Sequence, residues 1–155
     1  ILNWEMGSFY YFGYASNLDS STLEGRLRTN PFKIGIGVLP HHGFRFNHPN
    51  PDGSARANIV FSENESVYGL IFKIQKEDKA YFLTSEPGYD FVEKEIFTKN
   101  GKINAFVFIS KNTQEGLFPK EEYWKVILKG GKESGIPDSY LAQVINRKSR
   151  NTKSL

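Results

Sequence analysis

Strand-like runs dominate the middle of the chain, and they constrain the fold more than any other feature of the sequence. Phe, Tyr, Val and Ile recur there in short alternating or continuous apolar runs, a pattern typical of β-strands. Val67–Phe72 is almost wholly apolar, which predicts a central strand buried on both faces. Asn100-Gly101 predicts a hairpin between the last two runs. The expected strands are Phe9–Tyr14, Phe32–Leu39, Phe44–Phe46, Ala57–Phe61, Ser66–Ile74, Tyr89–Thr98 and Lys102–Ile109.

Helical patterns flank and interrupt these strands at about residues 19–28, 76–85, 120–132 and 138–146. Asp19 or Ser20 can cap the first helix. Strand and helix come first, then a strand-rich middle, then paired helices, an order that predicts an α+β fold or mixed barrel rather than a doubly wound sheet. We expect a single domain over residues 8–147 and a basic tail over residues 148–155. The side chains expected to pack inward from the second and third helices are Ala80, Phe82, Leu83, Tyr123, Trp124, Ile127 and Leu128.

Composition excludes several classes of protein. The 155 residues are enough for one domain with its own core. Cysteine is absent, which excludes disulfides, thiolate metal sites and a cysteine nucleophile and fits a reducing compartment, so we expect a cytoplasmic location. No run approaches the roughly 20 apolar residues of a membrane span, and residues 1–7 lack the pattern of a secretory signal. We therefore expect no membrane partner.

Positive charge gathers near the end of the chain, which has a net charge of +3. Arg147, Lys148, Arg150 and Lys153 form a cluster without an acidic residue. Such a cluster can bind nucleic acid or an anionic surface. It contains no aromatic side chains on which bases could stack, so we expect a solvated tail and no nucleic-acid partner. A basic, β-rich nucleic-acid-binding domain is kept as an alternative.

The first candidate site is the turn Tyr14-Ala15-Ser16-Asn17-Leu18, between the first strand and the first helix. A turn of small residues at this junction presents backbone N–H groups and the positive end of a helix, which together can bind an anion such as a carboxylate. The side chains of Ser16 and Asn17 can add to it. Because such junctions are common, an ordinary structural turn is the alternative.

Glu86 is the second candidate. It follows an apolar helix and precedes Pro87-Gly88, so we expect its carboxylate at a helix end near buried aromatic rings. That position suits a group that takes and then returns a proton. A capping or solvated glutamate is the alternative. The competing residues are Glu77, Glu93 and Glu95, of which the last two share an expected exposed strand face.

The histidines and the glycines point to no cofactor. His41 and His42 are adjacent, so on a strand they face opposite sides and do not readily share a metal. We expect these two and His48 on the surface or in turns, and no metal site. The sequence has no Gly-x-Ser-x-Gly motif, phosphate loop or dinucleotide fingerprint, so we expect no cofactor.

Three segments, taken in order, share one resemblance. Tyr11–Leu18 carries a Tyr-Ala-Ser-Asn-Leu turn after an aromatic strand, Phe82–Glu86 ends in a glutamate, and Tyr123–Pro137 carries a tyrosine followed by Gly-Lys-Glu-Ser-Gly-Ile-Pro. Their order and spacing resemble the γ-glutamylcyclotransferase (AIG2-like) family over about residues 10–145. That family has Tyr-Gly-Ser-Asn/Leu in the turn, Leu-Asp-x-x-Glu before its acid/base glutamate, and an active-site tyrosine on its late helix.

The resemblance implies a small mixed β-barrel flanked by helices. It also implies an enzyme that cyclises the γ-glutamyl group of a small γ-glutamyl amine, amino acid or peptide to 5-oxoproline and releases the amine, without a cofactor or metal. Glu86 is then the catalytic acid/base. The implied substrate-binding residues are Tyr14, Ala15, Ser16, Asn17, Leu18 and Tyr123.

Two departures from the family pattern stand out. Ala15 replaces the glycine of the turn, and Leu83 replaces the aspartate before the glutamate. A glycine permits a positive φ, which alanine tolerates poorly. The alternative function is therefore a non-catalytic relative that binds a small molecule or a partner. The leaving amine and the oligomeric state are not predicted.

Overall fold

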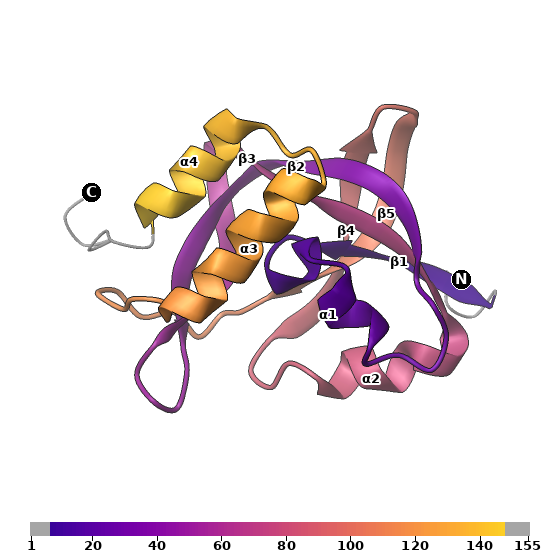
Figure 1. Cartoon of the computed structure of the whole chain (residues 1–155), viewed down its shortest axis with the longest axis horizontal. Coiled ribbons are helices and arrows are strands. Elements are labelled where there is room, and N and C mark those ends of the chain that lie inside the picture. Colours follow the sequence, from indigo (N-terminus) through magenta and orange to yellow (C-terminus); the bar gives the residue numbers. More distant parts are fainter. Residues whose placement is uncertain (1–6, 148–155) are drawn as a thin grey trace.

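A closed five-stranded barrel forms the centre of the computed structural model, which describes residues 7–147 (Figure 1). The strands follow one another around the barrel in the order β1-β3-β2-β4-β5. Parallel pairing of Tyr11 on β1 with Phe106 on β5 closes it. The strands are β1 (Ser8–Gly13), β2 (Phe32–Pro49), β3 (Ala55–Gln75), β4 (Asp90–Thr98) and β5 (Gly101–Ile109). The expectations for the first residues and for the tail at 148–155 lie outside the described residues, apart from Gly7.

Helices cover the barrel, and two of them pair on one face. In Figure 1, α3 and α4 lie together across β2 and β3, and α3 packs against the 3₁₀ turn that precedes the short α1. Among residues 7–147, no helix has the length and apolar character needed to cross a membrane. The helices are the 3₁₀ turn η2 (Ser16–Leu18), α1 (Ser21–Glu24), the 3₁₀ turn η3 (Lys76–Asp78), α2 (Lys79–Thr84), α3 (Glu121–Glu133) and α4 (Asp138–Arg147).

The two longest strands correct the expected segmentation. Phe32–Leu39 and Phe44–Phe46 belong to one strand, β2, which continues to Pro49. Ala57–Phe61 and Ser66–Ile74 likewise belong to β3. Residues 62–65, which separate the two expected strands, form an irregularity in the β2–β3 pairing opposite His41, between the pairs His42–Phe61 and Pro40–Ser66. The polar residues there interrupt the register without reversing the chain, because the pairing resumes on both sides.

Aromatic rings fill the barrel. Phe9, Phe12 and Phe72 are almost completely buried, and the rings of Phe9 and Phe82 meet edge to face with centroids 5.6 Å apart. The buried stretch Val67–Phe72 lies in the middle of β3, as its apolar run predicts, with only Tyr68 partly exposed. The hairpin expected at Asn100-Gly101 joins β4 to β5, with Thr98 paired to Gly101. Burial of these large apolar surfaces is the main stabilising contribution to the barrel.

The helix after β3 packs through one side chain. Phe82 on α2 is buried, whereas Leu83 is 53% exposed and Ala80 is also exposed, so the expectation for those two residues is wrong. One short helix has room for one inward position per turn, and Phe82 takes it. The buried carboxylate of Asp78, just before α2, accepts hydrogen bonds from the backbone N–H of Arg28 at 2.7 Å and the hydroxyl of Thr29 at 2.6 Å. These bonds tie α2 to the segment that follows α1.

Candidate active site

One small pocket brings together most of the residues that the sequence singled out. Its wall includes Glu86, just beyond α2, and the turn after β1. Leu18 is not part of the wall, because its side chain is 2% exposed and belongs to the core. The predicted residues that line the pocket are Tyr14, Ala15, Ser16, Asn17, Glu86 and Tyr123, and its other lining residues are Tyr11, Arg56, Ala57, Tyr89 and Phe108.

The turn after β1 accepts alanine at the position where the family has glycine. Ala15 has φ −125° and ψ −120°, so this position does not use the left-handed conformation that favours glycine. The helix that follows is much shorter than expected, since η2 covers three residues and α1 four. The macrodipole of so short a helix is small. Within residues 7–147, the backbone N–H groups of Ser16 and Asn17 have no hydrogen-bond acceptor, so these two donors remain for a ligand.

Two side chains of the turn hold it in place. The amide of Asn17 donates to the hydroxyl of Tyr11 at 2.7 Å, and its oxygen accepts from Thr22 at 3.0 Å. The buried hydroxyl of Tyr14 donates to the backbone oxygen of Phe108 at 2.7 Å. These side chains therefore shape the pocket that the turn lines.

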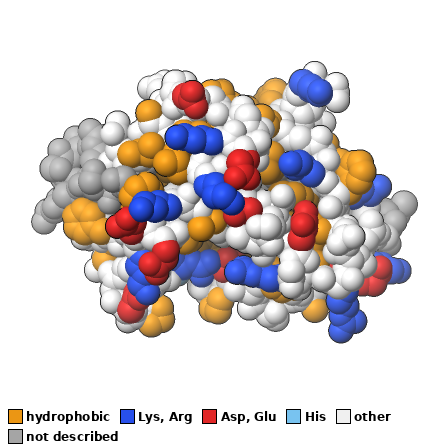
Figure 2. Space-filling view, viewed as in Figure 1, with side chains coloured by type: hydrophobic (Ala, Val, Ile, Leu, Met, Phe, Trp, Pro, Cys, Tyr) orange, Lys and Arg blue, Asp and Glu red, His pale blue; other side chains and the backbone are white. Residues whose placement is uncertain are grey.

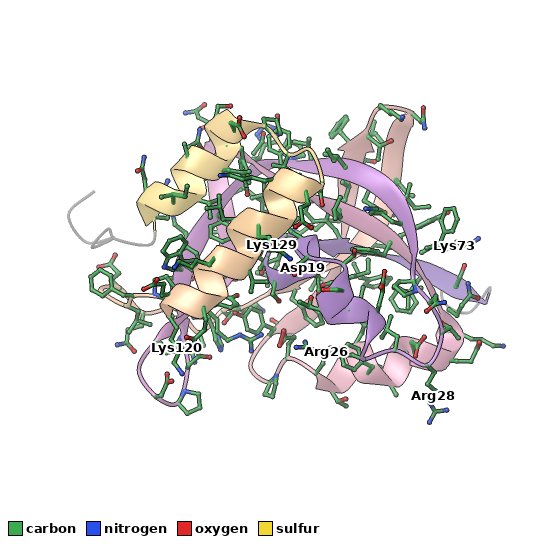
Figure 3. All side chains as sticks on the ribbon, viewed as in Figure 1. Asp19, Arg26, Arg28, Lys73, Lys120 and Lys129 are labelled. Atoms are coloured by element: carbon green, nitrogen blue, oxygen red, sulfur yellow. The ribbon has the colours of Figure 1, made fainter. Side chains whose placement is uncertain are left out.

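Helix α3 packs closely on the same turn. A Cβ added at Gly130 would lie 2.3 Å from the backbone nitrogen of Asp19 and 2.4 Å from the carbonyl carbon of Leu18, so only glycine fits here without a shift. The hydroxyl of Ser134 donates to the backbone oxygen of Leu18 at 3.2 Å. Figure 3 shows Lys129 of α3 beside Asp19, with 3.7 Å between their charged groups. These contacts of α3 therefore hold the turn in position.

Glu86 is bound to an arginine that the sequence did not single out. The Nη2 atom of Arg56 lies 2.5 Å from each carboxylate oxygen of Glu86, and both side chains are about a quarter exposed. Burial alone lowers the pKa of Arg56, but the hydrogen bond and charge of Glu86 outweigh it and raise that pKa, so the guanidinium stays charged. No local pattern marks Arg56, because its meeting with Glu86 depends on the strand register that pairs Arg56 with His48.

The tyrosines of the pocket remain protonated. Burial raises the pKa of Tyr14, Tyr89 and Tyr123 above its usual value near 10. The hydroxyl of Tyr123 accepts from the backbone N–H of Ala57 at 3.1 Å, and that of Tyr89 donates to the backbone oxygen of the same residue at 2.5 Å. At neutral pH none of these three tyrosines is a phenolate.

A family model described as the AIG2-like family matches residues 66–144, which is more than half of the chain. The chain belongs to the AIG2-like family. Among the curated relatives of this AIG2-like chain are the γ-glutamylcyclotransferases of Bos taurus and Homo sapiens. Each is 29% identical to it over 86% of the chain and 75% of the relative.

Solved structures share the fold of the AIG2-like chain. A protein named γ-glutamyl cyclotransferase superposes with a TM-score of 0.76 at 24% identity, covering 89% of this chain and 86% of its own. YkqA from Bacillus subtilis superposes with a TM-score of 0.78 at 16% identity, covering 92% of this chain and 55% of its own. The expected mixed β-barrel flanked by helices is thereby confirmed.

One histidine of the AIG2-like chain lies next to the site, contrary to expectation. His41 is exposed, whereas His48 is only 6% exposed. Its Nδ1 atom lies 2.6 Å from the hydroxyl of Ser110, and its ring lies 4.4 Å from that of Tyr89, between centroids. The turn residues around His48 suggested a surface position for it. Strand β2 continues through His48, however, and the side chain of His48 points into the protein. Among residues 7–147, no three His, Asp or Glu side chains are grouped to hold a metal ion.

Stability should depend on pH through His48. Burial, followed by the charge of Arg56, lowers the pKa of His48 below 6.5, while the backbone of Asn112 and the charge of Glu86 oppose that shift. The unfolded chain then binds a proton first as the pH falls below about 6.5, so the free energy of unfolding decreases until the folded-state pKa is passed. Urea unfolding at pH 7.5 and pH 5.5 measures this decrease.

The matched variants are His48→Gln and His41→Gln. We expect the first to remove most of the decrease between pH 7.5 and pH 5.5, and the second to retain it, because His41 is exposed. Carboxylates with a lowered pKa, such as Glu65, lose their contribution only at lower pH. A decrease that persists unchanged in His48→Gln would assign the pH dependence to another group.

Proposed function

We propose that this chain is a γ-glutamylcyclotransferase that converts the γ-glutamyl group of a small amine, amino acid or peptide to 5-oxoproline and releases the amine. The observation that carries the proposal is the position of Glu86, which lines one pocket together with the turn at residues 14–17 and Tyr123. The curated relatives named γ-glutamylcyclotransferase support the same activity. We propose a cytoplasmic location on the absence of cysteine.

The reaction balances within the substrate. The α-amine attacks the γ-carbonyl carbon, a C–N bond forms to close the five-membered ring, and the C–N bond to the leaving nitrogen breaks. The attacking ammonium loses two protons on becoming the ring N–H, and the leaving nitrogen gains two on departing as an ammonium. Neither water nor a redox partner is consumed.

Glu86 is the proton carrier in this proposal. Its carboxylate takes a proton from the α-ammonium, which makes the amine nucleophilic, and gives that proton to the leaving nitrogen as the tetrahedral intermediate collapses. The second proton follows the same route, from the ring nitrogen to Glu86 and from Glu86 to the departing amine. A substrate folded in the pocket holds amine and carbonyl within reach, which lowers the entropic part of the barrier. One carboxylate serves both steps because the two nitrogens are bonded to the same carbon in the intermediate.

The turn after β1 and Tyr123 bind the substrate in this proposal. The free N–H groups of Ser16 and Asn17 donate either to the α-carboxylate or to the oxyanion that develops on the γ-carbonyl oxygen. Tyr123, which is protonated and lines the same pocket, donates a hydrogen bond to the substrate. Leu18 supports the turn from the core instead of touching the substrate.

The test is 5-oxoproline release from a panel of γ-glutamyl amines, amino acids and dipeptides. We expect turnover of at least one member, with 5-oxoproline and the free amine formed in equal amounts. The panel includes the matching α-glutamyl compounds as controls. In these compounds the amine is bonded to the α-carbonyl, so closing the ring at the γ-carboxyl does not release it. Absence of 5-oxoproline from every γ-glutamyl compound would contradict the proposal.

A non-catalytic binding relative is the second candidate. The observation that favours it is the ion pair between Arg56 and Glu86, which occupies both oxygens of the proposed acid/base. Calorimetric binding of γ-glutamyl compounds without turnover would support this candidate. The nucleic-acid alternative predicts oligonucleotide binding that weakens steeply with salt. On the face in Figure 2, acidic and basic side chains are interspersed, with no continuous basic surface of the kind such binding uses.

A further inference from the structure

Arg56 stands between two cavities. It lines the small pocket with Glu86, and it also lines a neighbouring cavity of about 500 Å³ between the β2–β3 turn and the start of α3. Tyr123 likewise borders both. Lys120, at the start of α3 in Figure 3, is 2.7 Å from Asp52 on the rim of the larger cavity, so its charge is already paired. Arg56 is therefore a cation that contributes to the walls of both cavities.

The small pocket that Arg56 and Glu86 line has little free space. Its cavity volume is about 30 Å³, room for only a few water molecules. A γ-glutamyl group is far larger than a water molecule, so Arg56 or the turn must move before substrate enters. A single nitrogen, Nη2, makes both contacts with Glu86, so the guanidinium can leave without breaking a two-nitrogen bidentate contact.

A carboxylate on the leaving group can replace Glu86 as the ion-pair partner of Arg56. In a γ-glutamyl amino acid, that carboxylate is attached to the carbon next to the leaving nitrogen. Glu86 must reach the same nitrogen to protonate it, so a guanidinium 2.5 Å from Glu86 is also within reach of the carboxylate. Arginine pairs with carboxylates through directed, charge-assisted hydrogen bonds.

We propose that Arg56 is a specificity residue that exchanges Glu86 for a carboxylate on the leaving group, which seats that group in the larger cavity and frees Glu86 for proton transfer. The inference rests on the proposed function and deepens it. The exchange replaces one ion pair by another, so Arg56 is never left buried without a partner. A leaving group without a carboxylate offers no replacement, and Arg56 then stays on Glu86.

The ring of Tyr89 supports the guanidinium during this exchange. The central carbon of Arg56 lies 5.4 Å from the centroid of that ring, a distance at which a cation is attracted to the aromatic face. The hydroxyl of Tyr89 is fixed by the backbone oxygen of Ala57, so the ring is held in position. Arg56 can therefore turn from one carboxylate to the other without losing this contact.

The test compares two substrates that differ only by a carboxylate, γ-glutamylalanine and γ-glutamylethylamine. We expect kcat/KM of the native chain to be on the order of 10–100-fold higher for γ-glutamylalanine, the range for one charge-assisted hydrogen bond. In Arg56→Met this ratio should fall toward one, mainly through loss on γ-glutamylalanine. Arg56→Gln is the second variant, which keeps polar character without the charge. Thermal unfolding of each variant checks that it folds.

Arg45→Met is the matched control. Arg45 forms a comparable, partly buried ion pair with Glu65 outside the pocket, so its loss should leave the substrate ratio unchanged. A ratio near one in the native chain, or an unchanged high ratio in both Arg56 variants, would overturn the role of Arg56 without touching the proposed function.

Calorimetry separates the two proposals further. Failure of every γ-glutamyl compound to turn over would overturn the proposed function, whereas Arg56 would still be tested by binding of the same two compounds. Preferential binding of γ-glutamylalanine that disappears in Arg56→Met supports the inference. Equal binding of the two compounds to the native chain contradicts it.

Discussion

Replacing Glu86 with glutamine lowers kcat for 5-oxoproline release by about 10²–10⁴-fold, the usual contribution of a general acid/base. Glutamine keeps the size of the side chain but neither takes a proton from the α-ammonium nor returns one to the leaving nitrogen. The tyrosines of the pocket remain protonated and do not replace it. Steady-state assay of 5-oxoproline with the best substrate of the panel measures the effect.

Two measurements keep this result specific to catalysis. Glu93→Gln, on the exposed face of β4, is the matched control and should retain activity. Glu86→Gln should keep the native circular dichroism spectrum, with a small change in unfolding temperature because Arg56 loses its charged partner. Activity of Glu86→Gln equal to that of the native chain would show that another group carries the proton.

Adding one methyl group at Gly130 should both destabilise the chain and impair the site. The new Cβ of Gly130→Ala would overlap backbone atoms of Leu18 and Asp19, which cannot rotate away as a side-chain end can. Overpacking of this kind costs about 1–3 kcal/mol of unfolding free energy. The turn that holds Ser16 and Asn17 must shift as well, so we expect KM to rise. Chemical unfolding and substrate titration measure the two effects.

Gly25→Ala is the control for that change. Gly25 follows α1 with φ −74°, and no atom lies within 4 Å of an added Cβ. The substitution should be neutral or slightly stabilising, since alanine restricts the unfolded chain. If Gly130→Ala were as stable and active as Gly25→Ala, α3 would not position the turn after β1.

Much of the barrel was predictable because its signals are local. The apolar run Val67–Phe72 predicts a buried strand, and these residues form a buried part of β3. Asn100-Gly101 predicts the hairpin between β4 and β5, and Thr98 pairs with Gly101 across it. In each case the residues that form the element also carry the signal, so neighbours in sequence suffice to identify it.

The lengths of elements were harder to predict, because distant contacts decide them. Residues 62–65 have the composition of a turn, yet β3 continues through them because β2 pairs with it on both sides. The first helix was expected to reach about Arg28, but α1 ends at Glu24. The segment that follows α1 is held by the buried carboxylate of Asp78, about fifty residues away in sequence. Helix propensity depends on local residues alone, so it does not predict this contact.

Residue types and local patterns in the sequence determined the strand-rich α+β class and the turn after β1. The order of three segments that resemble one family singled out Glu86 and the tyrosine at the start of α3. Only the tertiary structure placed Glu86 in one pocket with that turn, moved Leu18 into the core, buried His48 and paired Arg56 with Glu86. These relations follow from strand register and from the approach of α3 through Gly130. Register and close approach are properties of the folded chain, since they arise only when segments far apart in sequence pack together.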